Sequence, residues 1–359
     1  METEEAKSLN PGEFPPTYIA GFHYEDWVRC MEYRMLGKTG FYVSKLSLGG
    51  SSLAGIYNNI DVNEAIEVMR EGIKRGVNLI DTAPWYGEGR SECLLGQILL
   101  TIPRKAYFLC TKVGRYQQDK SKMFDFSAKK TLESVNLSLE RLKVSYIDLV
   151  QVHDIEFAPN PEIVLNETLV ALDSLRAAKK VRFVGITGYP LEMLKYILSK
   201  SRIKIDTILS YCHSSLHDDT LHEYSNFFKE KQVAIISASP MSMGLLTDNG
   251  PPMWHPSGKD LREACAKAAQ FCRLKGVSIS KLAMHFSLSL PYVDTTLVST
   301  DKLEYLYANL EINKGSLTET ESETMVYICE HFFKPLKVKS WEGVELEKYK
   351  TALKKLTSV

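Results

Sequence analysis

The sequence predicts a (β/α)8 barrel, in which eight parallel strands close into a barrel and helices cover it. From residue 45 to about residue 310, short runs with strand character alternate with amphipathic helical runs, the pattern of a parallel sheet covered by helices. Eight such pairs occur without a dominant linker, which favours one closed barrel over two open sheets. The length of 359 residues agrees, because α/β barrels exceed the usual domain size as single units.

The elements follow one another in a regular order. The predicted strands cover residues 45–50, 77–81, 106–112, 146–153, 181–187, 207–211, 233–237 and 295–299. The predicted helices cover residues 61–75, 91–101, 127–143, 162–179, 190–200, 218–230, 258–275 and 301–310. The first helix has its own boundary signals: Asp61 followed three residues later by Glu64 is a variant of the capping box, and Gly76 is a helix stop.

Two flanks lie outside the repeat, so we divide the chain into an N-terminal extension (1–32), the barrel (33–335) and a C-terminal tail (336–359). Residues 33–43 read as a β-hairpin with its turn between Gly37 and Gly40. Residues 317–334 have a helical pattern, and the remainder is rich in lysine. The barrel is therefore expected to carry an N-terminal hairpin cap and extra C-terminal helices.

Composition excludes several classes of protein. Forty-four basic and forty-four acidic residues cancel, so no global field favours nucleic acid or an anionic membrane. No apolar run is long enough for a membrane helix, and the acidic N-terminus is unlike a secretory signal, so we expect a cytoplasmic protein. Seven cysteines without a CxxC pair indicate reduced thiols. His213, His217 and His222 lack the partners of a known zinc spacing, and we expect no metal.

Four polar residues carry the chemistry. Asp81, Lys112 and His153 each end a predicted strand, and Tyr86 follows the first of these strands closely. Strand ends are where a parallel barrel places its active site. A carboxylate, a phenol, an ammonium and an imidazole at one mouth form a plausible site for proton transfer.

This arrangement of residues resembles that of the aldo-keto reductases. Their sequence pattern is Asp-Thr-Ala-x-x-Tyr-Gly, then a strand ending in Lys, then a strand ending in His. The resemblance covers roughly residues 33–309. Within the family, four sequence segments resemble those of the branch of L-galactose, L-fucose and D-arabinose dehydrogenases. They are DTAPWYG at 81–87, HDIEF at 153–157, GITGYP at 185–190 and SYCH at 210–213.

The resemblance implies a role for each residue of the tetrad. Tyr86 is the general acid or base, although a free phenol has a pKa of about 10 and is a poor base near neutrality. Lys112 would favour the phenolate through its charge, and Asp81 would hold the ammonium in place. His153 could donate a hydrogen bond to the substrate oxygen. Two neighbours are candidate substrate contacts: Trp85 as an aromatic wall, and Asp154 as a partner of a sugar hydroxyl or a support for a loop.

A nicotinamide cofactor, NAD or NADP, is implied by the same resemblance. No Gly-x-Gly-x-x-Gly motif follows the first strand, so a Rossmann-type dinucleotide site lacks its fingerprint. The family binds this cofactor extended across the barrel mouth. Residues 239–246 match its Ser-Pro-Leu-x-x-Gly-Leu-Leu loop, whose small residues admit pyrophosphate. The positions carried over are Thr187, Gly188, Ser210, Tyr211, Ser239, Pro240, Met241, Gly244, Leu245, Ser299, Lys302 and Asn309.

Some of these positions depart from the family. Thr187 and Gly188 replace a Ser-Asn pair that contacts the nicotinamide carboxamide, and Ser210 and Tyr211 stand where many relatives have Gln and a stacking aromatic. Asp301 and Glu304 lie where relatives carry a basic clamp for the 2′-phosphate of NADP. These acidic residues would disfavour the 2′-phosphate of NADP. The choice of cofactor stays open, and the resemblance to the sugar dehydrogenases tilts it slightly towards NAD.

Three functions remain open at the level of sequence. The first is an NAD(P)-dependent dehydrogenase that oxidises the anomeric carbon of an aldose to a lactone. The second is a broad NADPH-dependent aldehyde or ketone reductase that runs the same tetrad in reverse. The third is a regulatory subunit that keeps the barrel but works by binding a partner, which the intact tetrad disfavours.

Overall fold

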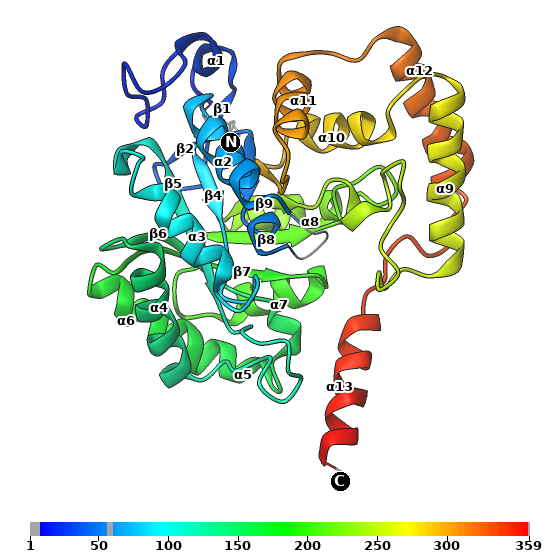
Figure 1. The fold of residues 1–359 in the computed structure, drawn as a ribbon. Helices are drawn as coiled ribbons and strands as arrows, with labels where there is room; N and C mark the ends of the chain where they lie inside the picture. Colours follow the sequence, from blue (N-terminus) through cyan, green and yellow to red (C-terminus); the bar gives the residue numbers. More distant parts are fainter. Residues whose placement is uncertain (1–7, 56–59, 358–359) are drawn as a thin grey trace.

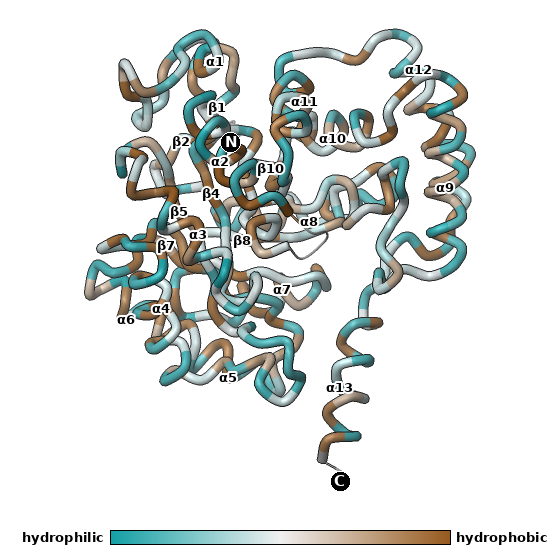
Figure 2. The backbone as a smooth tube through the Cα atoms, in the orientation of Figure 1, coloured by the Kyte–Doolittle hydropathy of each residue, from teal (hydrophilic) through white to brown (hydrophobic). Residues whose placement is uncertain are grey.

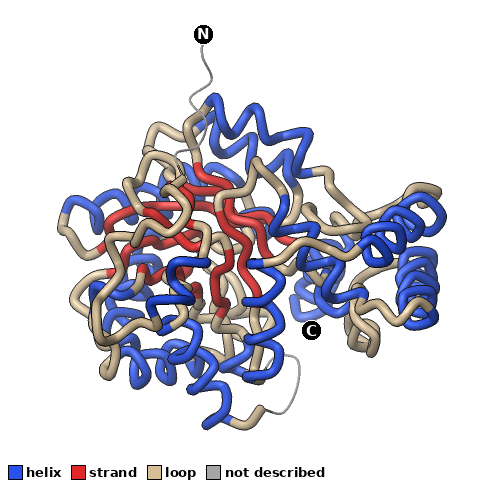
Figure 3. Tube along the Cα trace, turned by 90° about the horizontal axis from the view of Figure 1, so that it is seen from above, coloured by secondary structure: helices blue, strands red, loops and turns tan. Residues whose placement is uncertain are grey.

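The computed structural model, which describes residues 8–55 and 60–357, is a closed barrel of eight parallel strands ringed by helices (Figures 1 and 3). The strand order around the barrel is β10-β3-β4-β5-β6-β7-β8-β9. Their bounds are β3 Leu46–Gly49, β4 Leu79–Asp81, β5 Phe108–Val113, β6 Ile147–Val152, β7 Val181–Gly188, β8 Thr207–Tyr211, β9 Ala234–Ala238 and β10 Thr295–Val298. The predicted fold is confirmed, with strand ends displaced by a few residues.

The helices follow the strands as expected. Those in the barrel layer are α2 Val62–Lys74, α3 Arg90–Leu99, α4 Ala128–Leu142, α6 Leu169–Ala177, α7 Leu191–Lys200, α8 Leu221–Glu230, α10 Ile279–Ser289 and α11 Leu303–Lys314. The segment predicted as one helix at 162–179 consists of α5 Pro161–Ile163, a π-helical turn and α6. Helix α8 begins three residues later than predicted.

Helix α2 shows how the sequence sets a boundary. Asp61 caps it by accepting hydrogen bonds from the backbone N–H groups of Asn63 and Glu64, at 2.9 and 3.3 Å. Gly76 ends it in the left-handed region, with φ of 93°. The reciprocal half of the capping box does not form, because the Glu64 carboxylate accepts from the Leu303 N–H instead, at 3.1 Å.

The segment between β9 and β10 corrects one prediction. A single helix at 258–275 was expected there, but the structure has two, α9 Lys259–Leu274 and α10. Helix α9 packs against α10 and α12 at the outer side of the molecule, while α10 packs on β10 and α11 (Figure 1). Gly276 ends α9, and Ser278 caps α10 by accepting from the Lys281 N–H at 3.3 Å.

The lower end of the barrel is closed by the predicted hairpin, β1 Tyr33–Met35 and β2 Tyr42–Ser44. Its turn uses Gly37 and Gly40 at φ of 52° and 75°, a conformation that glycine adopts without strain. Leu36 and Phe41 are buried with the residues that fill the barrel, and the Phe41 ring stacks on Phe108 at 4.0 Å. The hairpin is therefore an apolar plug.

The N-terminal extension packs on the barrel without a separate core. It contains the short helix α1 Glu25–Cys30, whose Val28 belongs to the same buried cluster as the strands. Three aspartates lie near the starts of the strands; Asp148 and Asp206 are buried, and Asp294 is partly buried. Asp148, Asp206 and Asp294 accept hydrogen bonds from the backbone N–H groups of Leu109, Val184 and Ile235 respectively.

The C-terminal segment returns to the mouth of the barrel. It comprises α12 Glu319–Ile328, a π-helical turn at Cys329–Phe333 and α13 Val344–Thr357, in which hydrophobic and hydrophilic residues alternate (Figure 2). Trp341 is 2 % exposed and its ring stacks on Tyr189 at 5.0 Å. Tyr349 meets Phe124 and Phe157 edge-on. No helix in the described residues is long and apolar enough to span a membrane.

Candidate functional site

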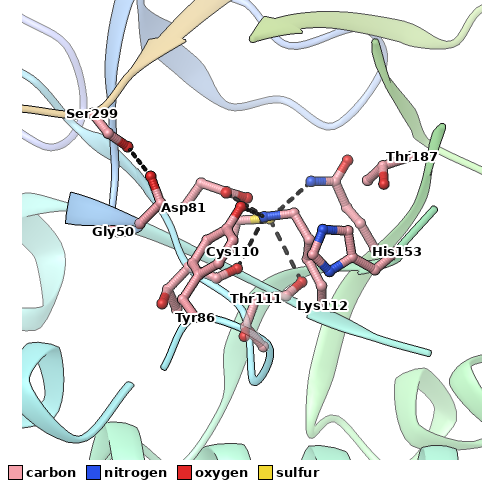
Figure 4. A network of polar contacts seen from close by, with 12 residues as sticks. Gly50, Asp81, Tyr86, Cys110, Thr111, Lys112, His153, Thr187 and Ser299 are labelled. Carbon is pink, nitrogen blue, oxygen red and sulfur yellow. Dashed lines mark hydrogen bonds and ion pairs between the residues drawn. The ribbon is translucent and has the colours of Figure 1, made fainter. Parts of the chain in front are cut away.

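The four residues of the predicted tetrad meet at the carboxyl end of the barrel (Figure 4). Asp81 ends β4, Lys112 lies near the end of β5, and His153 follows β6 directly. Tyr86 lies in the turn between β4 and α3. Side chains alternate between the two faces of a strand, and these strand positions all face inward.

Lys112 is the centre of the cluster. Its ammonium group pairs with Asp81 and donates hydrogen bonds to the Thr82 carbonyl at 3.0 Å and to the Tyr86 hydroxyl at 3.4 Å. The side chain is 2 % exposed. A buried ammonium with three acceptors is fixed in position, so it presents a constant positive charge to the Tyr86 oxygen.

Burial and charge act in opposite directions on this pair. Burial alone would lower the pKa of Lys112, but Asp81 and Tyr86 reverse that effect and raise its pKa above the usual value. Burial raises the pKa of Tyr86, and the opposing charge of Lys112 reduces the rise without cancelling it. The charge of Lys112 thus favours the phenolate, but the phenol of Tyr86 is on balance harder to ionise than that of a free tyrosine.

His153 completes the group. Its ring meets the Tyr86 ring edge-on, with centroids 6.0 Å apart. Burial lowers the pKa of His153 to about 3, so the imidazole is neutral near pH 7. Its Nδ1 atom is buried and has no hydrogen-bond partner among the described residues. A neutral imidazole with a free ring nitrogen can hydrogen-bond a substrate oxygen.

Arg115 is a site residue that the sequence did not reveal. Its guanidinium pairs with Asp154 at 2.7 Å and lies over the Trp85 ring at 4.1 Å. Asp154 lies beside His153, with 3.7 Å between its carboxylate and the His153 Nε2 atom. Arg115 therefore joins the two predicted substrate residues into one wall of the mouth. Only its position after β5 could have pointed to it.

The predicted nicotinamide positions lie at the ends of β7 and β8. Thr187 accepts a hydrogen bond from the Asp154 N–H at 3.0 Å, and Gly188 pairs in register with Ser210. The Ser210 hydroxyl is buried and has no partner among the described residues. The Tyr211 ring stacks on Tyr189 at 4.9 Å. Ser210 thus keeps an unused donor and acceptor near the end of β8.

The loop after β9 carries the predicted pyrophosphate positions Ser239, Pro240, Met241, Gly244 and Leu245. Four of its residues lie in the left-handed region: Ser239, Ser242, Met243 and Gly244 have φ of 59°, 49°, 52° and 103°. Such a concentration of unfavourable backbone angles is typical of a functional loop. His217 holds the turn through the Ser242 hydroxyl at 2.8 Å.

The predicted adenosine positions follow β10. Ser299 accepts a hydrogen bond from Ser51 at 2.7 Å, Asn309 is buried, and Lys302 lies over the Tyr305 ring at 5.7 Å. The carboxylate of Glu64 occupies the first turn of α11 through its bond to Leu303 N–H. Asp301 precedes α11 and Glu304 lies in its first turn, so three acidic residues are associated with this helix start.

The three histidines considered for a metal have other environments. His213 bonds Asp218 at 2.8 Å, His217 bonds Ser242 and the Lys339 carbonyl, and the His222 ring lies against Tyr292. Among residues 8–55 and 60–357, no group of three or more His, Cys, Asp or Glu side chains could hold a metal ion.

Comparison with known proteins identifies the family. The model of the aldo/keto reductase family matches residues 45–329, which is most of the chain. This chain belongs to the aldo/keto reductase family. It is therefore an NAD(P)-dependent oxidoreductase that acts on CH–OH or carbonyl groups.

Several relatives of this aldo/keto reductase are characterised. L-galactose dehydrogenase of Arabidopsis thaliana is 40 % identical over 319 residues, covering 87 % of this chain and 97 % of that protein. D-arabinose 1-dehydrogenase of Saccharomyces cerevisiae is 31 % identical over 321 residues, covering 84 % and 94 %. An aldo-keto reductase of Bacillus halodurans, solved in its holo form, superposes with a TM-score of 0.67 at 26 % identity, covering 83 % and 96 %.

The residues of this aldo/keto reductase fit a bound nicotinamide cofactor. The unpartnered Ser210 hydroxyl lies near the end of β8, the left-handed turn follows β9, and the buried Asn309 lies in α11, which follows β10. Strands β8, β9 and β10 are neighbours in the barrel, so an extended ligand could pass over the loops that follow them.

Proposed function

We propose that this aldo/keto reductase is an aldose 1-dehydrogenase that oxidises the anomeric carbon of a sugar such as L-galactose, L-fucose or D-arabinose. The observation that carries the proposal is the convergence of Lys112, Tyr86 and His153 on one point at the mouth. The names of the two relatives described above support the substrate class.

In this proposal Tyr86 is the general base. Its phenolate oxygen would accept the proton of the anomeric hydroxyl as the C1–H bond breaks, and NAD(P), when bound, would supply the hydride acceptor. Lys112 stabilises the phenolate that accepts this proton, because its ammonium lies 3.4 Å from the Tyr86 oxygen. Asp81 keeps the ammonium in place. General acid-base catalysis of this kind contributes about 10²–10⁴-fold to the rate.

His153 orients the sugar in this proposal. As a neutral imidazole it donates from its unpartnered nitrogen to the anomeric oxygen, so that the C1–H bond is directed at the cofactor. Trp85 and Arg115 form the wall beside it and exclude water from that side. The stabilisation of the developing charge therefore falls to Lys112 and His153 together.

We infer that NAD is preferred to NADP. The first turn of α11 is occupied by the Glu64 carboxylate and flanked by Asp301 and Glu304, and Lys302 is the one basic residue in residues 299–309. A 2′-phosphate at this position would meet three carboxylates, whereas ribose hydroxyls could donate hydrogen bonds to them.

The test is to incubate the purified protein with NAD or NADP and a panel of aldoses that includes the three sugars above, and to follow the absorbance of the reduced nicotinamide. We expect turnover with at least one of these sugars and faster turnover with NAD. Calorimetric titration with each cofactor alone gives the preference independently of activity. Silence with every sugar, combined with NADPH oxidation by simple aldehydes, would contradict the dehydrogenase proposal and favour a carbonyl reductase.

A further inference from the structure

A small pocket lies near Asp154, the neighbour of His153, between the barrel mouth and the C-terminal segment. It is lined by the side chains of the loop after β6, by the ends of β7 and β8, and by the start of α13. The residues that matter here are Glu156, Tyr211, Trp341 and Glu345. The pocket has about 20 Å³ of space for a water-sized group, room for one hydroxyl or one water.

Two buried polar groups in this pocket have unused hydrogen-bonding capacity. Glu156 is 7 % exposed; one carboxyl oxygen accepts from the Tyr189 N–H at 3.1 Å, while its other oxygen has no partner among the described residues. Trp341 is 2 % exposed, and its indole N–H lies near the Glu345 carboxylate without a hydrogen bond of ordinary geometry. Unsatisfied buried polar groups are costly, which points to a ligand that satisfies them.

The charge of the pocket suits a neutral hydroxyl. Burial, together with the neighbouring Asp154 carboxylate, raises the pKa of Glu156 to about 8, so the group is mostly an uncharged carboxylic acid at pH 7. A carboxylic acid can both donate and accept, as a hydroxyl can. Burial also raises the pKa of Glu345, although Arg115 opposes the rise. An anionic ligand would meet the charge of Asp154 nearby.

We propose that Glu156 and Trp341 form a hydroxyl-binding subsite that receives the exocyclic C6 hydroxyl of an aldose whose C1 lies at the tetrad. This deepens the proposed dehydrogenase function and rests on it. The pocket admits only one small group, and the C6 hydroxyl is the one that projects from a pyranose ring on a freely rotating bond. The ring hydroxyls stay in the wider mouth, between Trp85 and Tyr211.

Two sugars test this subsite cleanly, because L-fucose is L-galactose without the C6 hydroxyl. We expect the wild type to have a higher kcat/KM for L-galactose than for L-fucose. Glu156→Leu should reduce that ratio about tenfold, the usual effect of losing one hydrogen bond, since L-fucose does not use the pocket. Trp341→Phe, which keeps the aromatic ring but removes the N–H, should reduce the ratio in the same direction.

Two further variants sharpen the result. Glu156→Gln retains an acceptor for Tyr189 N–H and a donor into the pocket, so it should restore most of the ratio lost in Glu156→Leu. Glu347→Leu is the matched control, because Glu347 is an exposed carboxylate of α13, with 73 % of its side chain accessible. A galactose-to-fucose ratio that stays unchanged in Glu156→Leu and in Trp341→Phe would overturn the subsite.

The subsite and the dehydrogenase proposal can fail separately. If the wild type oxidises neither sugar, the proposed function is wrong, and the subsite is then tested by calorimetric titration of the protein with L-galactose and L-fucose in the presence of NADH. Tighter binding of L-galactose, lost in Glu156→Leu, would support the subsite. Equal binding of the two sugars, or no binding of either, would overturn it.

Discussion

The strand-start aspartates at the lower end of the barrel have hydrogen-bond partners, whereas several buried polar side chains at its mouth keep an atom without one in the part of the chain that the structure describes. At the lower end, the aspartates of the strand starts each accept a backbone N–H, and the hairpin plugs the opening with Leu36 and Phe41. At the mouth, several buried polar atoms have no hydrogen-bond partner in the described residues. They are Asp81 Oδ2, His153 Nδ1, Glu156 Oε2, Ser210 Oγ and Trp341 Nε1.

The difference separates stability from chemistry within one fold. A satisfied carboxylate at the lower end contributes to the free energy of unfolding, and changing it should leave turnover alone. An unsatisfied group at the mouth is held ready for a ligand, and changing it should affect turnover more than stability. Each prediction below tests one side of this division.

The largest effect is expected at Tyr86. Tyr86→Phe removes the phenolic oxygen that accepts the proton in its ionised form, and it should lower kcat by at least about 10³-fold. The fold and the affinity for NAD, measured by calorimetric titration, should be retained, because the ring remains. Tyr305→Phe, at an exposed tyrosine of α11, is the control. Turnover near the wild-type rate in Tyr86→Phe would contradict the assignment of the proton acceptor.

Lys112 lies at the mouth but is expected to affect both stability and turnover. Lys112→Met leaves Asp81 buried without its partner and should lower the free energy of unfolding by about 3–5 kcal/mol, measured by urea denaturation. Any remaining oxidation should require a higher pH, because Lys112 lowers the pKa of Tyr86 and Tyr86 must lose its proton to act as a base.

The double variant Asp81→Asn with Lys112→Met distinguishes the two roles. It removes both charges, so most of the lost stability should return while turnover stays low. Recovery of turnover together with stability would mean that the pair is structural only.

Asp148, at the lower end of the barrel, is expected to affect stability but not turnover. Its carboxylate accepts from the Leu109 N–H and pairs with Arg104 and Arg182, and it is 1 % exposed. Asp148→Asn should lower the free energy of unfolding by about 2–3 kcal/mol and change kcat/KM less than about twofold. Asp173→Asn, at an exposed ion pair with Arg176, should cost about 0–1 kcal/mol. A large loss of turnover in Asp148→Asn would contradict the assignment of the lower end to stability and the mouth to catalysis.

The smallest effect is expected from pH at His213, which links the mouth to the segment before α13. Burial alone would lower the pKa of His213, but Asp218 and Glu342 together raise it to about 9. The protonated form is thus favoured in the folded state, so its stabilisation is complete below about pH 6.5 and is lost as the pH rises through 9. Between pH 7.5 and 9.5 the free energy of unfolding should fall by about 2 kcal/mol more than in His213→Asn. Parallel pH curves for the two proteins would contradict this.

The parts of the molecule that could be predicted are those with a local signal. The strands can be recognised as apolar runs in the sequence. Asp81, Lys112 and His153 lie at the ends of such runs, and the geometry of a parallel barrel brings these strand ends together. The hairpin turn was readable from Gly37 and Gly40, which both adopt left-handed angles. Helix α10 was missed because its apolar residues follow α9 after a short break at Gly276, so that two helices read as one helix and a loop.

The remaining site residues have no local signal. Arg115 comes from the loop after β5, Glu156 from the loop after β6, and Trp341 and Glu345 from the C-terminal segment. Their meeting depends on loop paths and on how α13 packs against Phe124 and Phe157, which periodicity does not encode. The same reason explains the pKa of Tyr86: the charge of Lys112 could be foreseen, but the degree of burial could not.

Closure of the barrel has a consequence for how the protein is made. The last strand, β10, pairs with the first, β3, and the hydroxyl groups of Ser47 and Thr295 that join them are 248 positions apart in the chain. At about 5–20 residues per second, a ribosome needs about 12–50 s to synthesise the chain from β3 to β10. During that interval the nascent sheet has an open edge at β3, and this is the stage at which a chaperone would protect the chain from aggregation.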